Sequence, residues 1–321
     1  MKYKMLLIFL TVFFIFGIMG CAQKQNGGVP ATGSSNYLSI QDDAGRQVIL
    51  PKKPERIVPL SQSLVDLLYA VGGSAAGRPS SRTGTLPKDM QILPEVGHVA
   101  NINTEKVMSL QPDLVIGYQG LHEKNIPIME SSNIPFIIVK IKTYDDVIKN
   151  INLFGGIAGR REQARIVADQ MNQRIKKVVD QLPSTSKSAV ILHATGNSVT
   201  VQLENSIAGD VAKIIKLKNV AADSIPLDGN PESTPYSIEK LVEKDPDIIL
   251  ITFMGEKADI EKRLKLEVES NPAWNGLRAV QNKQVFYLSM ELFLLNPGIR
   301  YDEAVAYMAK IVYPETYGII Q

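Results

Sequence analysis

The chain carries one short pattern twice, and this repeat constrains the fold more than any other feature. N-T-E-K-V-M-S-L-Q-P-D-L-V-I begins at Asn103, and S-I-E-K-L-V-E-K-D-P-D-I-I-L begins at Ser237, 134 residues later. Each copy predicts an N-cap residue, a two-turn helix, a Pro-Asp turn and an apolar strand. We therefore expect two lobes with the same local architecture.

Strands and helices alternate around both copies of the repeat. This alternation is typical of a parallel sheet of the α/β class, and 321 residues suit two lobes. The expected strands lie within 40–50 and at 56–60, 114–118, 136–139, 189–193, 248–252 and 284–288, and the expected helices at 62–71, 104–110, 122–132, 208–217 and 301–313.

Residues 144–182 break the alternation with a long helical stretch. Three glycines between 155 and 159 interrupt it, and from Arg161 onward apolar residues recur at steps of three and four. This pattern predicts a long helix that joins the lobes. We place the N-terminal lobe at 38–142, a helical linker at 143–182 and the C-terminal lobe at 183–321.

The N-terminus indicates where the protein works. A short basic start and an uncharged apolar run ending at Gly20 are typical of a secretory signal. The next residue, Cys21, completes an I-M-G-C segment that resembles the lipobox of bacterial lipoproteins, in which this cysteine is acylated. We expect a lipoprotein signal peptide at 1–20, a flexible tether at 21–37 and a lipid anchor on the extracytoplasmic face of the cell membrane. A plain signal peptide or membrane anchor with an incidental cysteine is the alternative.

Composition argues against several classes of function. The 35 Lys+Arg and 33 Asp+Glu give a net charge of +2, without the basic footprint of a nucleic-acid-binding protein. One cysteine cannot build a cysteine-based zinc or iron–sulfur site. The sequence also lacks G-x-S-x-G, G-x-x-x-x-G-K-[ST], G-x-G-x-x-G and H-E-x-x-H motifs, so we do not expect an enzyme.

Glu105 and Glu239 occupy the same place in the first turns of the two repeated helices. A carboxylate there gains about 0.3–1 kcal/mol from the helix dipole, so local stability could explain each glutamate. A two-lobed binding protein would also use such a pair to dock on a partner with two subunits. The residues alone leave both explanations open.

Several segments resemble the solute-binding lipoproteins of ABC importers for iron chelates, haem and cobalamin. They are P-E-R-I-V from Pro54, P-E-V-G-H from Pro94, both repeat copies, and N-P-A-W-N-G-L-R-A-V-Q-N-K-Q-V-F-Y-L from Asn271. The resemblance implies two Rossmann-like lobes joined by one long helix, with a ligand cleft between them. It also implies a monomer that delivers its ligand to a permease dimer with a cytoplasmic ATPase. Glu105 and Glu239 would contact arginines of that permease.

Within this family, the chain looks most like haem-binding surface lipoproteins of Gram-positive bacteria. The segments are G-R-P-S-S-R-T-G-T-L-P, P-E-V-G-H-V-A-N-I-N and T-F-M-G-E. Those proteins hold haem iron between a Met of the first lobe and a His of the second. Here the two positions fall on Ala100 and Met254, with His98 two residues before the first. The resemblance therefore suggests His98 and Met254 as iron ligands, with the residue types exchanged between the lobes.

Further residues could contact a ligand. Arg78, Arg82 and Arg300 could grip haem propionates or siderophore oxygens through charge-assisted hydrogen bonds. Tyr118 could stack on a flat ligand or ligate iron. Arg300 could instead brace the last helix.

The remaining histidines are also candidates, because His122 and His193 lie near strand ends, where α/β ligand sites form. Structural explanations stand beside the functional ones. Met254 could pack in the core, and His98 could cap a helix or lie in solvent.

We therefore expect a lipid-anchored receptor that captures an iron complex as transported cargo, without a prosthetic group. Haem is the first choice, a ferric siderophore the second and cobalamin the third. A divalent-metal importer lipoprotein that uses the three histidines with a carboxylate is an alternative. A membrane sensor or adhesion lipoprotein is another.

Overall fold

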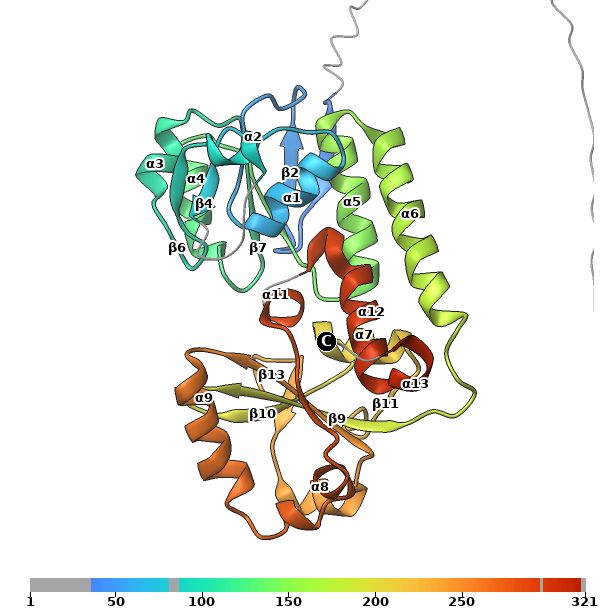
Figure 1. Ribbon diagram of the computed structural model, residues 1–321. Coiled ribbons are helices and arrows are strands. Elements are labelled where there is room, and N and C mark those ends of the chain that lie inside the picture. The colour runs from blue at the N-terminus through green and yellow to red at the C-terminus, as the bar shows by residue number, and fades with distance from the viewer. Residues whose placement is uncertain (1–35, 81–86, 295–296, 319–321) are drawn as a thin grey trace, which may run out of the picture. The chain divides into compact units, whose positions relative to one another are not determined.

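The computed structural model describes residues 36–80, 87–294 and 297–318. The described residues all belong to one compact unit (Figure 1). Cys21 and Arg82 lie outside the described residues, as does the expected signal peptide.

The N-terminal half is built on a parallel sheet with the strand order β3-β7-β8. Helices α1 and α5 pack on one face of this sheet, and α3 and α4 on the other. A hairpin β1–β2 and a small sheet β4-β5-β6 complete it. The elements are β1 (Leu38–Gln41), β2 (Gln47–Leu50), β3 (Ile57–Pro59), α1 (Gln62–Ala70), β4 (Arg78–Ser80), α2 (Lys88–Gln91), β5 (Glu95–His98), β6 (Asn101–Ile102), α3 (Thr104–Ser109), β7 (Leu114–Tyr118), α4 (Ile126–Ser131), β8 (Phe136–Val139) and α5 (Tyr144–Ala158).

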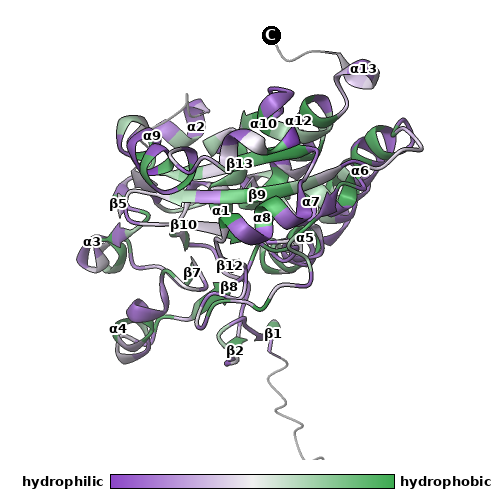
Figure 2. Ribbon diagram, turned by 90° about the horizontal axis from the view of Figure 1, so that it is seen from below, coloured by the Kyte–Doolittle hydropathy of each residue, from purple (hydrophilic) through white to green (hydrophobic). Residues whose placement is uncertain are grey.

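The C-terminal half contains a sheet with the order β12-β10-β9-β13-β14, and β11 pairs with β9. Strands β9 and β13 are hydrophobic along most of their length (Figure 2). Helices α7 and α12 cover one face, and α8, α9 and α10 cover the other. The elements are α6 (Arg161–Val179), β9 (Ser188–Thr195), β10 (Val199–Gln202), α7 (Ile207–Ile214), β11 (Lys218–Asn219), β12 (Ser233–Pro235), α8 (Ile238–Lys244), β13 (Ile248–Met254), α9 (Lys257–Leu264), α10 (Arg278–Gln281), β14 (Val285–Tyr287), α11 (Met290–Phe293), α12 (Tyr301–Val312) and α13 (Pro314–Tyr317).

The α/β class expected from the sequence is confirmed, but the second sheet is mixed rather than parallel. Strands β10 and β12 run antiparallel to their neighbours. They are four and three residues long, too short for an alternating pattern to stand out from the surrounding polar residues.

The two repeat copies adopt the same structure. Asn103 and Ser237 each cap a helix by accepting a hydrogen bond from a backbone N–H three residues later. The Asp that follows each helix then holds the start of a neighbouring strand. Asp113 accepts from the Arg56 amide at 2.8 Å before β3, and Asp247 accepts from the Ser188 amide at 2.8 Å at the start of β9.

The long helical stretch consists of two helices. Thr143 and Asp146 form a capping box at the start of α5. Gly159 ends that helix in the left-handed conformation with φ 65°, which glycine adopts without a steric penalty. The 19-residue α6 then runs alongside α5 (Figure 1). At 1.5 Å per residue it is about 28 Å long, and it is the single long helix that leads into the C-terminal sheet.

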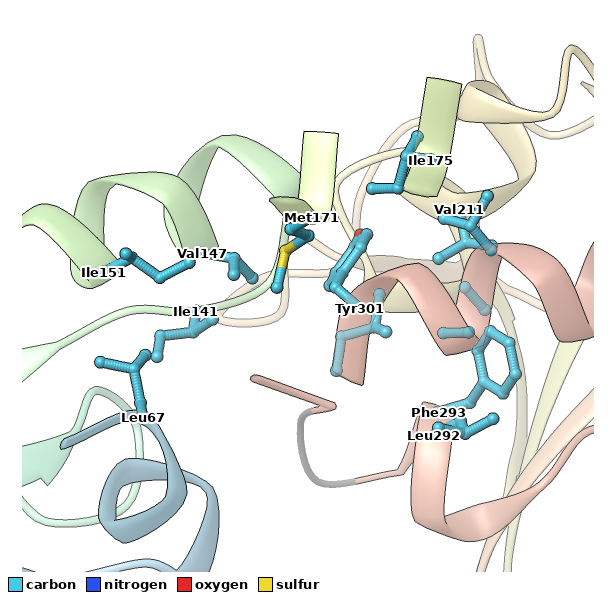
Figure 3. Packing of buried hydrophobic residues seen from close by; sticks show 14 of the residues in the cluster. Leu67, Ile141, Val147, Ile151, Met171, Ile175, Val211, Leu292, Phe293 and Tyr301 are labelled. Carbon is cyan, nitrogen blue, oxygen red and sulfur yellow. The ribbon is translucent and has the colours of Figure 1, made fainter. Parts of the chain in front are cut away.

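One hydrophobic core joins the two halves of this unit. Leu67 of α1, Met171 of α6, Val211 of α7 and Tyr301 of α12 belong to the same buried cluster (Figure 3). The halves therefore pack as one folded body. No helix among the described residues combines the length and apolar character needed to cross a bilayer.

Candidate functional site

The candidate site lies at the carboxyl ends of parallel strands, where ligand sites of α/β proteins form. Tyr118 ends β7 in the N-terminal half, and Met254 ends β13 in the C-terminal half. His193 lies on β9, paired in register with Thr252 of β13. These side chains differ in how many of their hydrogen-bonding atoms already have partners within the protein.

Tyr118 is held by the start of α1. Its hydroxyl lies 2.7 Å from the Ser63 hydroxyl. Burial raises the pKa of Tyr118 to about 12, so the side chain is a neutral phenol at physiological pH. This arrangement suits a hydrogen-bonding or stacking residue better than a phenolate ligand of iron.

His122 is fully engaged by the backbone around it. Its Nδ1 accepts from the Tyr118 amide at 2.8 Å, and its Nε2 lies 2.8 Å from the Val99 carbonyl, to which it donates. The side chain is 1% exposed, and this burial lowers its pKa. His122 therefore joins β7 to the loop that follows His98, and neither ring nitrogen is free to bind a ligand.

His98 ends β5 and is half-buried. Its Nδ1 accepts from the Ala100 amide at 3.3 Å, so the proton of the neutral ring lies on Nε2. A histidine that binds metal through Nε2 needs the opposite tautomer. His98 would have to release this contact before it could ligate iron through Nε2.

His193 has the tautomer that ligation through Nε2 requires. The Thr252 hydroxyl donates to the Leu192 carbonyl at 3.2 Å, and its oxygen therefore accepts from His193 Nδ1 at 3.0 Å. This leaves the lone pair on Nε2. Burial, and then the positive charge of Lys142, lower the pKa of His193 and keep the ring neutral. The only sequence signal was its position at a strand end.

Met254 is 51% exposed, so packing in the core does not explain it. It follows Thr252 by two residues and therefore lies on the same face of β13. Tyr287 of β14 and Met290 of α11 are also exposed, and both elements contact β13. Apolar and sulfur-containing side chains thus collect at this end of the sheet. Nothing in the sequence pattern pointed to Tyr287 or Met290.

The described candidate arginines are paired with acids. Arg78 is buried, with Nε on the Met90 carbonyl at 2.9 Å and Nη2 on Glu95 at 2.9 Å. This arrangement gives Arg78 a structural role within the small sheet. Arg300 binds Glu303 at 2.8 Å and lies 3.6 Å from Glu291.

Asp66 is a candidate ligand-binding residue that the sequence analysis missed. Burial raises its pKa, while a hydrogen bond from Gln62 at 2.8 Å and the charge of Arg300 act in the opposite direction. The buried Gln62 Oε1 has no hydrogen-bond partner among the described residues. The signal was present as a polar pair, four residues apart, on an otherwise apolar helix.

Glu105 and Glu239 are exposed on α3 and α8. Hydrogen bonds from its own amide and from the Ser237 hydroxyl lower the pKa of Glu239. Within the described part of the chain, neither glutamate has an ion-pair partner. Both carboxylates are therefore available to a cation outside the protein.

The described residues contain no group of three His, Cys, Asp or Glu side chains that could hold a metal ion. The histidine cluster of the divalent-metal alternative is thus not assembled here. Both ring nitrogens of His122 are engaged by the backbone, and His193 keeps only Nε2 free.

Comparison with known proteins gives consistent results. A family model described as "Periplasmic binding protein" matches residues 57–292. An uncharacterized ABC transporter substrate-binding lipoprotein of Bacillus subtilis, YvrC, is 26% identical over 288 residues, which are 87% of each chain. The high-affinity heme uptake system protein IsdE of Staphylococcus aureus is 25% identical over 81% of this chain and 88% of its own.

Two solved structures share the fold. A substrate-binding protein of an ABC transporter from Listeria monocytogenes superposes with a TM-score of 0.72 at 24% identity, covering 81% of this chain and 98% of its own. IsdE of Staphylococcus aureus in complex with heme superposes with a TM-score of 0.70 at 25% identity, covering 80% and 98%. Both matches extend over nearly the whole of the solved chains.

Proposed function

Because the chain belongs to the periplasmic binding protein family, we propose that it is the substrate-binding lipoprotein of an ABC importer and that its cargo is haem. The similarity to IsdE, which extends over 81% of this chain, carries the choice of haem. Exposed Met254 and the free Nε2 of His193 support it, because haem iron accepts thioether and imidazole ligands. A ferric siderophore is the second candidate and cobalamin the third.

The mechanism is reversible capture and release. Met254, Tyr287 and Met290 would cover the apolar faces of the porphyrin, while Tyr118 and Arg300 would contact its polar edge. His98 of the N-terminal half and Met254 of the C-terminal half are the proposed axial iron donors. His193 is the alternative donor from the C-terminal half. The reaction is binding and transfer, without a change in covalent bonds.

Absorbance titration with haemin tests the cargo. We expect a sharpened Soret band in the wild type and an altered band in Met254→Leu. An altered band in His193→Gln but not in Met254→Leu would assign the C-terminal iron ligand to His193 instead. Met290→Leu is the matched control, because it removes another exposed thioether that is not proposed to ligate iron. If the haemin spectrum did not change and calorimetry showed tight binding of a ferric siderophore, haem would be rejected as the cargo in favour of the siderophore.

Glu105 and Glu239 are the proposed contacts with a permease dimer that is driven by a cytoplasmic ATPase. In cells that carry the variant in place of the native copy, Glu105→Arg with Glu239→Arg should abolish haem uptake and leave haem affinity intact. Glu162→Arg, in the first turn of α6, is the control. Uptake at the wild-type rate in the double variant would contradict the docking role and favour a sensor or adhesion lipoprotein.

Cys21 is the proposed site of the lipid anchor, which would hold a monomer at the extracytoplasmic face of the membrane. The wild type should incorporate radiolabelled palmitate, and Cys21→Ser should not. Labelling of the serine variant would refute the assignment.

A further inference from the structure

A small cavity lies beneath α8, next to the proposed docking residue Glu239. Its volume is about 60 Å³. An engineered apolar cavity that binds benzene measures about 150 Å³, so this one is too small for haem or a siderophore. Most of the inner wall is apolar, formed by Val190, Val201, Val220, Ala221 and Leu241.

The cavity also contains an unsatisfied polar group. Tyr236 lines it, and the buried hydroxyl of this side chain has no hydrogen-bond partner among the described residues. An unpaired buried hydroxyl costs roughly 1–3 kcal/mol. A molecule that entered the cavity and offered one polar atom would recover part of that cost.

The cavity adjoins Glu239 through Ser237. Ser237 lines the cavity, caps α8 and donates to the Glu239 carboxylate at 2.8 Å. Exposed Lys240 and Lys244 form the rim. Ile225, which follows the lining residue Ser224, is 84% exposed. A surface of this kind fits a protein partner that combines a cation for Glu239 with a neighbouring apolar side chain.

We propose that this cavity is a socket for one aliphatic side chain of the permease, which inserts there when the permease docks on Glu239. This inference rests on the proposed function and adds an apolar anchor to its ion pair. The inserted segment would also supply a backbone carbonyl to the Tyr236 hydroxyl.

The N-terminal half lacks the corresponding space. At the positions 134 residues earlier, Ile102, Val107 and Leu110 replace Tyr236, Leu241 and Lys244. These three side chains pack in a buried cluster, and a Cβ added at Gly77 would lie 2.5 Å from Leu110 Cδ1. The two halves would therefore dock differently. The N-terminal half would use the charge of Glu105 alone, and the C-terminal half would use Glu239 together with the apolar cavity.

Two adjacent alanines provide a matched test of the socket. Ala221 lines the cavity, whereas Ala222 is exposed. Ala221→Leu should fill the cavity and lower the rate of haem uptake by cells about tenfold, with haem affinity and thermal unfolding unchanged. Ala222→Leu should transport haem like the wild type. Ser224→Phe, in the loop at the mouth, fills the same space and keeps the test valid if Ala221→Leu fails to fold.

A photo-crosslinking amino acid at position 224 identifies the occupant directly. We expect a crosslink to an apolar residue of the permease, and none from position 197, which lies in a loop on another side of the sheet. Loss of uptake in Glu239→Arg, but normal uptake in folded Ala221→Leu and Ser224→Phe, would overturn the socket and leave the docking pair intact. A small molecule retained in the cavity by native mass spectrometry would overturn it as well. Absence of uptake by the wild type would instead reject the proposed function.

Discussion

At the scale of single residues, His193 differs from the other two histidines because its partner fixes the opposite tautomer. His122 donates and accepts within the backbone, His98 accepts at Nδ1, and His193 donates at Nδ1. Only the last arrangement leaves a lone pair on Nε2. The sequence could not distinguish them, because Thr252 and Val99, the partners that decide the matter, lie 59 and 23 residues away.

The burial of His122 makes stability depend on pH. Its pKa is lowered in the folded state, so the unfolded chain binds more protons as the pH falls through about 6.5. The free energy of unfolding should therefore be smaller at pH 5.5 than at pH 7.5, by about 1 kcal/mol for this residue. Urea denaturation at both pH values measures the difference.

His122→Gln should reduce this pH dependence and lower stability at pH 7.5 by roughly 1–3 kcal/mol, because buried backbone groups lose their partner. If the unfolding free energy of the variant changed with pH as much as that of the wild type, a neutral His122 with a lowered pKa would be contradicted. His193 contributes in the same direction, since its pKa is also lowered, so part of the slope should remain.

At the scale of elements, α5 and α6 approach closely at one glycine. A Cβ at Gly155 would lie 2.3 Å from Ala164 Cβ, whereas a Cβ at Gly156 would meet nothing nearer than 3.6 Å. Gly155→Ala should therefore destabilise the protein by about 1–3 kcal/mol through overpacking. Gly156→Ala should stabilise it by about 0.5–1 kcal/mol, because glycine is unfavourable within a helix.

Thermal unfolding of the two variants measures this difference of sign between neighbouring positions. Equal effects of the two substitutions would show that the helices do not pack as described. The prediction needs the structure, since the sequence shows both glycines in the same helical stretch without indicating which one faces α6.

Most regular elements could be predicted because their signals are local. The paired helices of the repeat and their N-caps follow from residues three or four apart. The small sheet β4-β5-β6 and strands β10 and β12 could not be predicted. The pairing of β4 with β5 and of β10 with β12 joins residues well separated in the sequence, and all of these segments are short or polar.

At the scale of the whole molecule, Asp210 ties the two halves together. Its carboxylate in α7 accepts from the Tyr144 amide at the start of α5, at 2.8 Å, and from the Tyr301 hydroxyl at the start of α12, at 2.6 Å. Asp210→Ala should cost roughly 1–3 kcal/mol and broaden the distances between spin labels on α3 and α9. Asp210→Asn is the control, since one amide oxygen can accept both hydrogen bonds.

A narrow distance distribution in Asp210→Ala would show that the shared core alone fixes the halves. When Asp210 is present, we expect the distance between the spin labels on α3 and α9 to change little on addition of haem, the proposed cargo. The pKa of Asp210 is raised by burial, so the contact should persist when this group is protonated, because the carboxyl still offers an oxygen to both donors.

The border of the C-terminal sheet bears on how copies of the protein meet one another. The outermost strand β12 is three residues long and ends in Pro235, which has no N–H to offer. A short border strand interrupted by proline resists pairing with a strand of another chain. We therefore expect neighbouring copies not to associate through this edge, even where the proposed lipid anchor concentrates them on a membrane.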